Sequence, residues 1–179
     1  MIDSPPIEPS WPCVIKNNHV ALTRFSDIES FIEKYLNDME DGEQPTWTPP
    51  SEDAILDQHQ HRAVVEACMN SIFILNGGAG TGKTTVCSEI VKSLKYNVLC
   101  AAPTGKAAQR MAEVTNVKAY TVHRLVYMQE PPSASVLLLD EQSMQEPEIL
   151  AHLFLRLSFK KIIFVGDVAQ LTSVGPGQL

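Results

Sequence analysis

A glycine-rich phosphate loop constrains the fold of this chain more than any other feature. Residues Gly77–Thr84 read GGAGTGKT, which is a complete G-x-x-x-x-G-K-[ST] motif. The apolar run Ser71–Asn76 predicts a buried strand before the loop, and the pattern from Thr85 to Leu94 predicts a helix after it. This strand–loop–helix setting is the context that the motif requires. We therefore expect the chain to bind a nucleoside triphosphate.

Each part of the loop has an expected partner on the nucleotide. Backbone N–H groups and the start of the following helix are expected to bind phosphate oxygens. Lys83 is expected to reach the β- and γ-phosphates, and Thr84 is expected to coordinate Mg²⁺. The predicted phosphate-binding residues are Gly77, Gly78, Ala79, Gly80, Thr81, Gly82, Lys83, Thr84 and Thr85.

The composition is that of a globular protein. Of the 179 residues, 44% are hydrophobic and 20% are charged, which suits one domain of ordinary size with a small appendage. The net charge of −7 and the pI of about 5.2 argue against a strongly basic protein that coats nucleic acid. A local positive groove remains compatible with these values, and its binding to nucleic acid would be sensitive to salt.

The sequence contains no segment that suggests secretion or a membrane span. The N-terminus is acidic and rich in proline, and no apolar run approaches the roughly 18 residues of a membrane helix. The four cysteines show no C-x-x-C spacing, and Cys68, Cys87 and Cys100 lie in apolar surroundings. We expect these three to be reduced and buried, and the chain to be intracellular.

The sequence divides into four expected parts. Residues 1–12 are expected to be a disordered tail, because three prolines fall in the first nine residues. Residues 13–40 predict a small segment with two short strands and a helix at Ser26–Met39, whose apolar residues share one face. Residues 41–53 are acidic and rich in proline and glycine, which predicts a linker. Residues 54–179 form the expected nucleotide-binding domain.

Helices and strands are expected to alternate in this last part. The predicted strands are Ser71–Asn76, Asn97–Ala102, Ser135–Asp140 and Lys161–Val165, and the predicted helices are Asp57–Asn70, Lys83–Lys95, Gly105–Val114 and Glu146–Ser158. Nearly continuous apolar strands that alternate with helices predict a parallel sheet covered on both faces. The expected fold is therefore an α/β P-loop NTPase, preceded by a small N-terminal α+β segment. Its ligands should lie at the carboxyl ends of the strands.

Two acids follow the third expected strand. Val136–Leu139 is apolar and leads directly into Asp140 and Glu141. Asp140 is expected to join the Mg²⁺ shell, and Glu141 is expected to polarise an attacking water. A carboxylate is a stronger base than the glutamine that GTPases use in this place, so it suits hydrolysis. The alternative is a solvated acid pair at the end of a strand.

Further polar residues follow other expected strands. Gln170 comes after the fourth strand and could contact the γ-phosphate, although alone it would also fit an ordinary loop residue. Thr104, the turn at Gly105 and Lys106 follow the second strand and could hold a phosphodiester. His123, in the segment TVHR, could stack on a base or donate a hydrogen bond. Taken separately, these signals are weak.

The order and spacing of these motifs resemble the first motor domain of superfamily 1B DNA helicases of the RecD type, relatives of the exonuclease V alpha subunit. The matching segments are LDQHQHRAV (Leu56–Val64), NGGAGTGKTT (Asn76–Thr85), APTGKAAQRM (Ala102–Met111), YTVHRL (Tyr120–Leu125), LLLDEQSM (Leu137–Met144) and VGDVAQLTSVGPGQL (Val165–Leu179). The stretch WPCVIKNNHVALTRF with the helix after it resembles the small domain that precedes the motor in that family.

The resemblance implies a RecA-like domain that hydrolyses ATP with Mg²⁺ and acts on single-stranded DNA. The catalytic residues would be Lys83, Asp140, Glu141 and Gln170, with Thr84 and Asp140 at the metal. Gln60 would contact the adenine, and Gln170 would couple the state of the nucleotide to DNA. Thr104, Gly105, Lys106 and His123 would lie along the DNA strand. The family moves in the 5′→3′ direction and serves DNA recombination and repair.

The same resemblance implies an incomplete motor. The family has two tandem motor domains with ATP between them, and the sequence ends directly after the last motif of the first. None of the five arginines, Arg24, Arg62, Arg110, Arg124 and Arg156, falls in a motif typical of an arginine finger. We expect the chain alone to be a poor ATPase, and a partner protein could supply the second domain.

Two other functions remain open at this point. The chain could be a non-motor nucleotide-binding module that regulates or complements a partner. It could also be a GTPase or a small-molecule kinase, although the sequence contains no N-K-x-D guanine signature.

Overall fold

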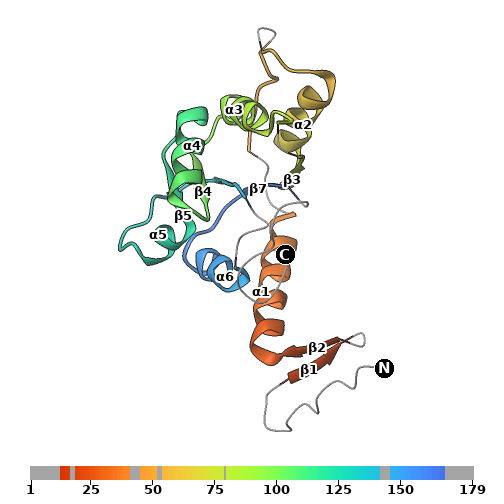
Figure 1. Ribbon diagram of the computed structural model, residues 1–179, viewed down its shortest axis with the longest axis vertical. Coiled ribbons are helices and arrows are strands. Elements are labelled where there is room, and N and C mark those ends of the chain that lie inside the picture. The colour runs from red at the N-terminus through yellow and green to blue at the C-terminus, as the bar shows by residue number, and fades with distance from the viewer. Residues whose placement is uncertain are drawn as a thin grey trace.

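A parallel sheet of five strands forms the centre of the computed structural model, which describes residues 13–16, 19–40, 45–51, 54–78, 80–141 and 146–167 (Figure 1). The strand order is β3-β7-β6-β4-β5. The strands are β3 (Ile72–Asn76), β4 (Val98–Ala102), β5 (Ala119–Thr121), β6 (Val136–Leu139) and β7 (Lys161–Gly166).

The register of the sheet brings the carboxyl ends of its strands to one edge. Asn76 pairs with Gly166 at the end of β3 and β7, and Ala102 pairs with Thr121 at the end of β4 and β5. All four residues of β6 are buried, as expected for a parallel strand that is covered on both faces. The α/β fold that the sequence predicts is therefore confirmed.

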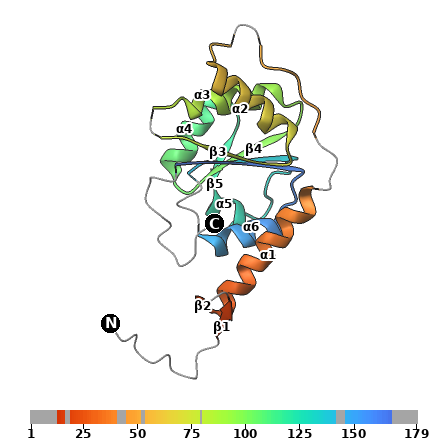
Figure 2. The same cartoon turned by 90° about the vertical axis from the view of Figure 1, so that its right-hand side faces the viewer.

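Helices cover both faces of the sheet (Figure 2). One face carries α2 (Gln58–Met69), α3 (Lys83–Ser93) and α4 (Gly105–Thr115), and the other carries α1 (Thr23–Glu40), α5 (Val122–Tyr127) and α6 (Pro147–Arg156). Strand β6 supplies both cores, because Val136 and Leu138 pack toward α2 and α3 while Leu137 and Leu139 pack toward α5 and α6. This alternation follows the two-residue period of a strand.

Cysteines contribute to the core on the α2–α3 face. Cys68, Cys87 and Cys100 are buried and free, as the sequence predicts. Within the part of the chain that the structure describes, no helix combines the length and the apolar character needed to cross a bilayer.

The N-terminal elements lead into the domain through a long helix. Strands β1 (Cys13–Lys16) and β2 (His19–Leu22) form an antiparallel hairpin at the start of α1 (Figure 1). Helix α1 packs on α6, and Ile32 and Met39 are buried there. The ring of Tyr35 stacks on Phe154 with centroids 4.4 Å apart, and its hydroxyl donates to the carbonyl of Leu157 at 3.3 Å. The predicted helix is thus confirmed, and it covers part of the sheet.

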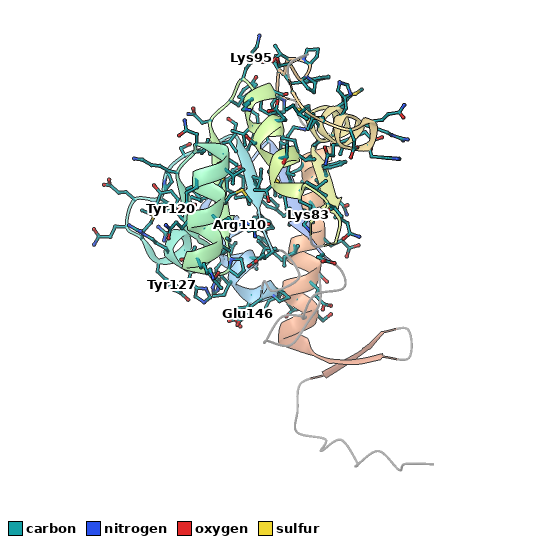
Figure 3. The ribbon with its side chains drawn as sticks, turned by 45° about the horizontal axis from the view of Figure 1, so that its top comes forward. Lys83, Lys95, Arg110, Tyr120, Tyr127 and Glu146 are labelled. Atoms are coloured by element: carbon teal, nitrogen blue, oxygen red, sulfur yellow. The ribbon has the colours of Figure 1, made fainter. Side chains whose placement is uncertain are left out.

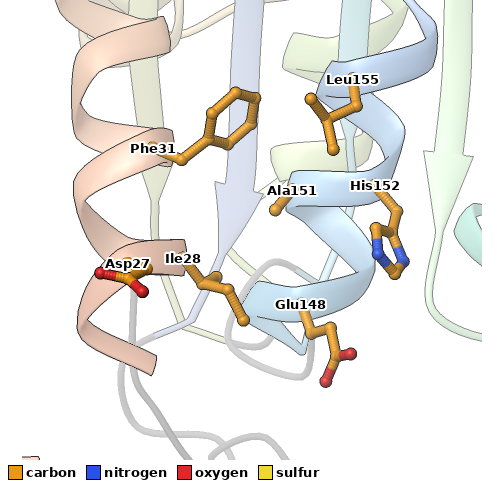
Figure 4. Close-up of a pocket in the computed structure, with 7 residues that line it drawn as sticks. All are labelled: Asp27, Ile28, Phe31, Glu148, Ala151, His152 and Leu155. Carbon is orange, nitrogen blue, oxygen red and sulfur yellow. The ribbon is translucent and has the colours of Figure 1, made fainter. Parts of the chain in front are cut away.

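An apolar groove separates the exposed sides of α1 and α6 (Figure 4). Ile28 and Phe31 of α1 point toward Ala151 and Leu155 of α6 across a cavity of about 530 Å³. The described residues that line it are Asp27, Ile28, Phe31, Glu148, Ala151, His152 and Leu155. No described residue of the phosphate loop is part of this lining, so the groove is separate from the described part of that motif.

Residues 45–51, inside the expected linker, lie against the end of α3. Trp47 forms an antiparallel bridge with Leu94, and the backbone N–H of Thr48 donates to the carbonyl of Ser93 at 2.8 Å. Pro45 and Pro50 are buried. These contacts attach residues 45–51 to the α/β domain, whereas the proposed division of the whole chain into domains stays a prediction.

The structure contains a strand and a helix that we did not predict from the sequence. The four strands that we expected are all present, and β5 adds a fifth at the edge of the sheet beside β4. Strand β5 has 3 residues, all partly exposed, and α5 has 6. Neither is long enough for hydrophobic periodicity to indicate it. Thr121 joins them, since its side chain caps α5 by accepting from the N–H of Arg124.

A buried lysine anchors the end of α2 to the sheet. Lys161 begins β7, is fully buried, and its Nζ donates to the carbonyls of Ala67, at 2.9 Å, and Asn70. The positive charge therefore sits at the carboxyl end of a helix, where the helix dipole favours it. Burial lowers the pKa of Lys161 to about 8, and the nearby Cys68 thiol opposes this shift.

This lysine predicts an unusual dependence of stability on pH. A folded-state pKa of about 8 lies below the ordinary value of 10.5, so burial of the charge costs stability in full below pH 8. The cost disappears as the pH rises to 10.5. Relative to Lys161→Met, the wild type should gain roughly 1–3 kcal/mol of unfolding free energy over this range.

Urea unfolding at a series of pH values would measure the difference between the two proteins, which cancels titrations that they share. Lys118→Met, at an exposed lysine, serves as the control and should keep the pH profile of the wild type. Parallel profiles for wild type and Lys161→Met would show that the buried ammonium does not titrate in this way.

Candidate active site

Loops from four strands meet at the carboxyl edge of the sheet. The phosphate loop follows β3, residues 103–104 follow β4, Asp140 and Glu141 follow β6, and Asp167 follows β7. The N–H of Gly77 donates to the carbonyl of Gly166 at 3.3 Å, which ties the phosphate loop to the end of β7. The N–H of Asp140 donates to Ala101 at 2.9 Å.

The loops enclose a cavity of about 350 Å³. Its described lining consists of Gly78, Gly80, Thr81, Gly82, Lys83, Thr84, Thr85, Cys87, Arg110, Met111, Asp140, Glu141 and Val165. The structure thus brings together the phosphate loop and the two acids, as the sequence predicts. Ala79 and Gln170 lie outside the described residues, so their predicted roles stay predictions.

Left-handed glycines shape the phosphate loop. Gly80 and Gly82 both have φ of +79°, a region that residues with a side chain rarely adopt. Gly82 also precedes the first turn of α3, and a Cβ atom there would lie 2.5 Å from Nε2 of Gln60. The hydroxyl of Thr81 donates to the carbonyl of Gly78 at 2.9 Å and closes the turn.

Lys83 points back into its own loop. Its Nζ donates to the carbonyls of Gly77 and Gly78, the second at 2.9 Å. A phosphate that enters the cavity could accept the third N–H of the Lys83 ammonium or take the place of these carbonyl oxygens as its acceptor. The exchange is favourable, because a hydrogen bond between two charged groups is stronger than one to a neutral carbonyl.

Asp140 and Glu141 form the acidic side of the cavity. Burial raises the pKa of Asp140, while the N–H of Glu141 and the cations Arg110 and Lys83 oppose the rise. Burial also raises the pKa of Glu141, the Asp140 carboxylate adds to the rise, and Arg110 opposes it. Glu141 has φ of +51°, which is uncommon for a residue other than glycine and typical of functional positions.

The oxygen atoms at this end of the cavity suit Mg²⁺. Thr84 supplies a hydroxyl and Asp140 a carboxylate, both of which line the cavity. In the described part of the chain, no group of three His, Cys, Asp or Glu side chains comes together as a metal cage. Mg²⁺ needs no such cage, because it is usually bound through one or two carboxylates together with substrate phosphates and water. The residues therefore fit the ion.

Gln60 connects α2 to the phosphate loop. Its backbone N–H donates to Oδ1 of Asp57 and its Oε1 accepts from the N–H of Asp57, which completes the capping box of α2. Its Nε2 donates to the carbonyl of Thr81 at 3.2 Å.

A second cavity of about 400 Å³ adjoins this side of the loop. Gln60 lines it with the apolar side chains of Ala63, Leu75 and Val86. A purine base could enter this second cavity. The contact of Gln60 with adenine stays a prediction.

The residues predicted to contact DNA lie at the starts of two helices, α4 and α5. Thr104, Gly105 and Lys106 are exposed at the start of α4, and the hydroxyl of Thr104 caps this helix by accepting from the N–H of Ala107 at 3.2 Å. His123 is exposed on α5, after the adjacent strand β5. The sheet therefore places all four near one edge.

Two residues at this edge were not predicted from the sequence to be part of a site. Arg110 of α4 reaches the phosphate cavity, where Nη2 donates to the hydroxyl of Thr84 at 3.5 Å. Tyr127 of α5 (Figure 3) is 69% exposed. Its ring centroid lies 6.5 Å from that of His123. Each lies four residues after a predicted DNA contact, Lys106 or His123. This helical spacing was the one signal that could have found them.

Comparison with known proteins identifies relatives of this chain. The profile of an AAA domain family matches residues 55–179. The ATP-dependent RecD2 DNA helicase of Deinococcus radiodurans is 33% identical over 135 residues, which cover 68% of this chain and 19% of that protein. The RecBCD enzyme subunit RecD of Haemophilus influenzae is 30% identical over 202 residues, which cover 91% of this chain and 29% of that protein. The chain thus spans less than a third of the length of these relatives.

A solved structure shares the fold. The crystal structure of Pif1 helicase from Bacteroides in complex with ADP-AlF3 and ssDNA has a TM-score of 0.54 and 26% identity. The similarity covers 69% of this chain and 34% of that one.

From the conformation of Gly82 we predict that a methyl group added at this position destabilises the protein. Gly82→Ala should lower the unfolding free energy by about 1–2 kcal/mol, because alanine is strained at positive φ. The new Cβ should also displace Gln60 from Thr81, which should weaken ADP binding.

Gly105→Ala provides the matched control, because a Cβ there meets nothing within 4 Å and its φ is ordinary. This variant should be neutral or stabilised by up to about 1 kcal/mol. Urea unfolding and calorimetry with ADP measure both effects. Equal stability of the two variants would contradict the strain that we assign to Gly82.

Proposed function

The chain belongs to the AAA domain family, as a relative of the RecD-type helicases, and from this premise we propose that it hydrolyses ATP to act on single-stranded DNA. One observation carries the proposal. The phosphate loop, Lys83 and the acids Asp140 and Glu141 line a single cavity at the carboxyl edge of the sheet. A site of this kind combines cationic groups for phosphate with a carboxylate base for water.

The phosphate loop would bind the triphosphate. Its backbone N–H groups and the N-terminus of α3 attract negative oxygens, and Lys83 would exchange the carbonyls of Gly77 and Gly78 for phosphate oxygens. The second cavity beside Gln60 would receive the base. Support for an adenine nucleotide comes from the Pif1 helicase, which was crystallised with ADP-AlF3.

Thr84 and Asp140 would hold Mg²⁺. When bound, the ion neutralises charge on the phosphate oxygens and orients them. The two protein ligands come from different elements, the start of α3 and the end of β6, so the packing of α3 on the sheet decides their separation.

Glu141 would act as the general base. Its carboxylate would accept a proton from the water that attacks the γ-phosphorus. Burial and the adjacent Asp140 raise its pKa, which brings a carboxylate closer to the operating pH and makes it a better base. The left-handed backbone at Glu141 turns the chain sharply where β6 ends, so the side chain faces the cavity.

Single-stranded DNA would pass the loops after β4 and β5. Thr104, Gly105 and Lys106 would contact phosphates, and His123 with Tyr127 would offer exposed rings on which bases can stack. The Pif1 complex, which contains ssDNA, supports this assignment. We further propose movement in the 5′→3′ direction and a second motor domain, in the same protein or in a partner, that completes the ATP site. Residues 1–179 alone should therefore turn over slowly.

The role of Glu141 predicts a separation of binding from turnover. Glu141→Gln should retain ATP affinity within about twofold and lose at least about 100-fold in hydrolysis, because the amide keeps the shape but cannot accept the proton. Calorimetry with ATPγS and phosphate release with ATP measure the two properties. Lys83→Ala is the control for the site, since it should lose binding itself.

Both assays should be repeated with single-stranded DNA. Stimulation of ATP hydrolysis by single-stranded DNA distinguishes a motor from a module that only binds nucleotide. Hydrolysis by Glu141→Gln at the rate of the wild type would exclude Glu141 as the base. Unchanged affinity in Lys83→Ala would contradict the nucleotide site altogether.

The DNA path predicts a loss of affinity that depends on salt. Lys106→Ala should weaken binding of a fluorescent oligothymidine by about 3–10-fold at low salt. It should also reduce the slope of log K against log salt concentration by about 1. Fluorescence anisotropy measures this change. Lys118→Ala removes an equal charge at another exposed position and should change affinity less. Equal losses in both variants would show only a general charge effect, and equal affinity for duplex and single strands would oppose the proposed path.

A further inference from the structure

Arg110 is a cation in the phosphate cavity that no motif assigns. Among the described residues that line this cavity, Lys83 and Arg110 are the two with a positive charge. They come from neighbouring helices, Lys83 from the first residue of α3 and Arg110 from the middle of α4 (Figure 3). The cavity therefore receives positive charge from two directions.

The two cations differ in how firmly they are held. Lys83 donates to two carbonyls of its own loop. Arg110 is exposed, and its hydrogen bond to the hydroxyl of Thr84 is 3.5 Å long, at the outer limit for such a bond. Its planar guanidinium has five N–H donors and suits the oxygens of a phosphate. A small movement of this side chain would exchange Thr84 for a stronger acceptor.

Arg110 faces the end of the cavity where the reaction would occur. It acts on the charges of both Asp140 and Glu141, and it contacts Thr84, a predicted Mg²⁺ ligand. The second cavity, which would hold the base, has Gln60 in its lining and does not include Arg110. The terminal phosphate is therefore the part of ATP that Arg110 can reach.

Helix α4 also carries the first predicted DNA contacts. Lys106 and Arg110 are four residues apart and share one side of the helix, about 6 Å apart along its axis. The opposite side is buried through Ala107, Ala108 and Met111. Thr104 fixes the start of the helix. A force on Arg110 would thus move Lys106 with it, because the two belong to one packed helix.

We propose that Arg110 binds the terminal phosphate of ATP and that α4 transmits this contact to the DNA loop at Thr104–Lys106. The inference rests on the proposed function, since it requires ATP in the cavity and DNA at the loop. It assigns to this domain an arginine of its own that distinguishes ATP from ADP, in addition to any arginine that a second motor domain supplies. The competing role is structural, in which Arg110 only balances the charge of Asp140 and Glu141.

Nucleotide binding separates these two roles. Arg110→Gln should weaken ATPγS binding by about tenfold or more, the usual effect of losing a charged hydrogen bond, and change ADP affinity by less than about twofold. Arg110→Lys keeps the charge and should lose less. Calorimetry with Mg²⁺ and each nucleotide gives the two affinities. Arg62→Gln removes the same charge from an exposed position on α2 outside both cavities and should leave them unchanged.

DNA binding tests the transmission through α4. The affinity for oligothymidine is measured by anisotropy with and without ATPγS at a concentration that saturates each protein. The ratio of the two affinities should differ from one in the wild type and approach one in Arg110→Gln. The affinity without nucleotide should stay the same in both, because Lys106 is intact. By linkage, DNA should change ATPγS affinity by the same ratio.

Several results would overturn the inference. Equal losses for ATPγS and ADP, or no loss for either, would leave Arg110 with only the structural role. A coupling ratio that Arg110→Gln does not change would remove α4 from the transmission. These outcomes differ from failure of the proposed function, in which the wild type itself would show no binding that depends on Lys83. Because Arg110 is exposed, the melting temperatures of Arg110→Gln and Arg110→Lys should equal that of the wild type. If Arg110→Gln is unstable, Arg110→Lys still tests the phosphate contact.

Discussion

The parallel hydrogen-bond ladder through β3, β7, β6 and β4 sets the position of every loop at the active-site edge of the sheet. It aligns the carboxyl ends of strands that are far apart in sequence, so that Gly77 bonds to Gly166 and Asp140 bonds to Ala101. A shift of one residue in any strand would turn its buried side chains to the other face. The cores on both faces therefore hold the register, and the register holds the phosphate loop beside the acids.

The site gathers charges that are unfavourable without a ligand. Asp140 and Glu141 are adjacent and partly desolvated, which raises the pKa of both carboxyls. Lys83 is turned toward carbonyl oxygens, and Arg110 makes only a long hydrogen bond. A metal ion with a triphosphate would satisfy all four groups at once, because it provides positive charge for the acids and negative oxygens for the cations. This electrostatic balance is the physical basis of the proposed activity.

Two helices connect the site to the rest of the domain in different ways. Helix α2 is held at its end by the buried Lys161 and touches the phosphate loop near its start through Gln60. Helix α2 thereby stabilises the position of the phosphate loop. Helix α4 has its buried side on the sheet and its cationic side along the cavity and the proposed DNA contacts at Thr104–Lys106. In the proposed mechanism, α2 keeps the loop in place, while α4 responds to the ligand.

Features that depend on local chemistry could be predicted from the sequence. The phosphate loop, the apolar strands, the acids after β6 and the three buried cysteines follow from short motifs and periodicity, and the structure confirms where these elements lie. Tertiary structure alone decided the features that depend on contacts between distant segments. Strand β5 exists because β4 offers it an edge, and Lys161 is buried because the end of α2 covers it. Arg110 lines the cavity because α4 packs beside α3, and no local pattern records which neighbour a helix will have.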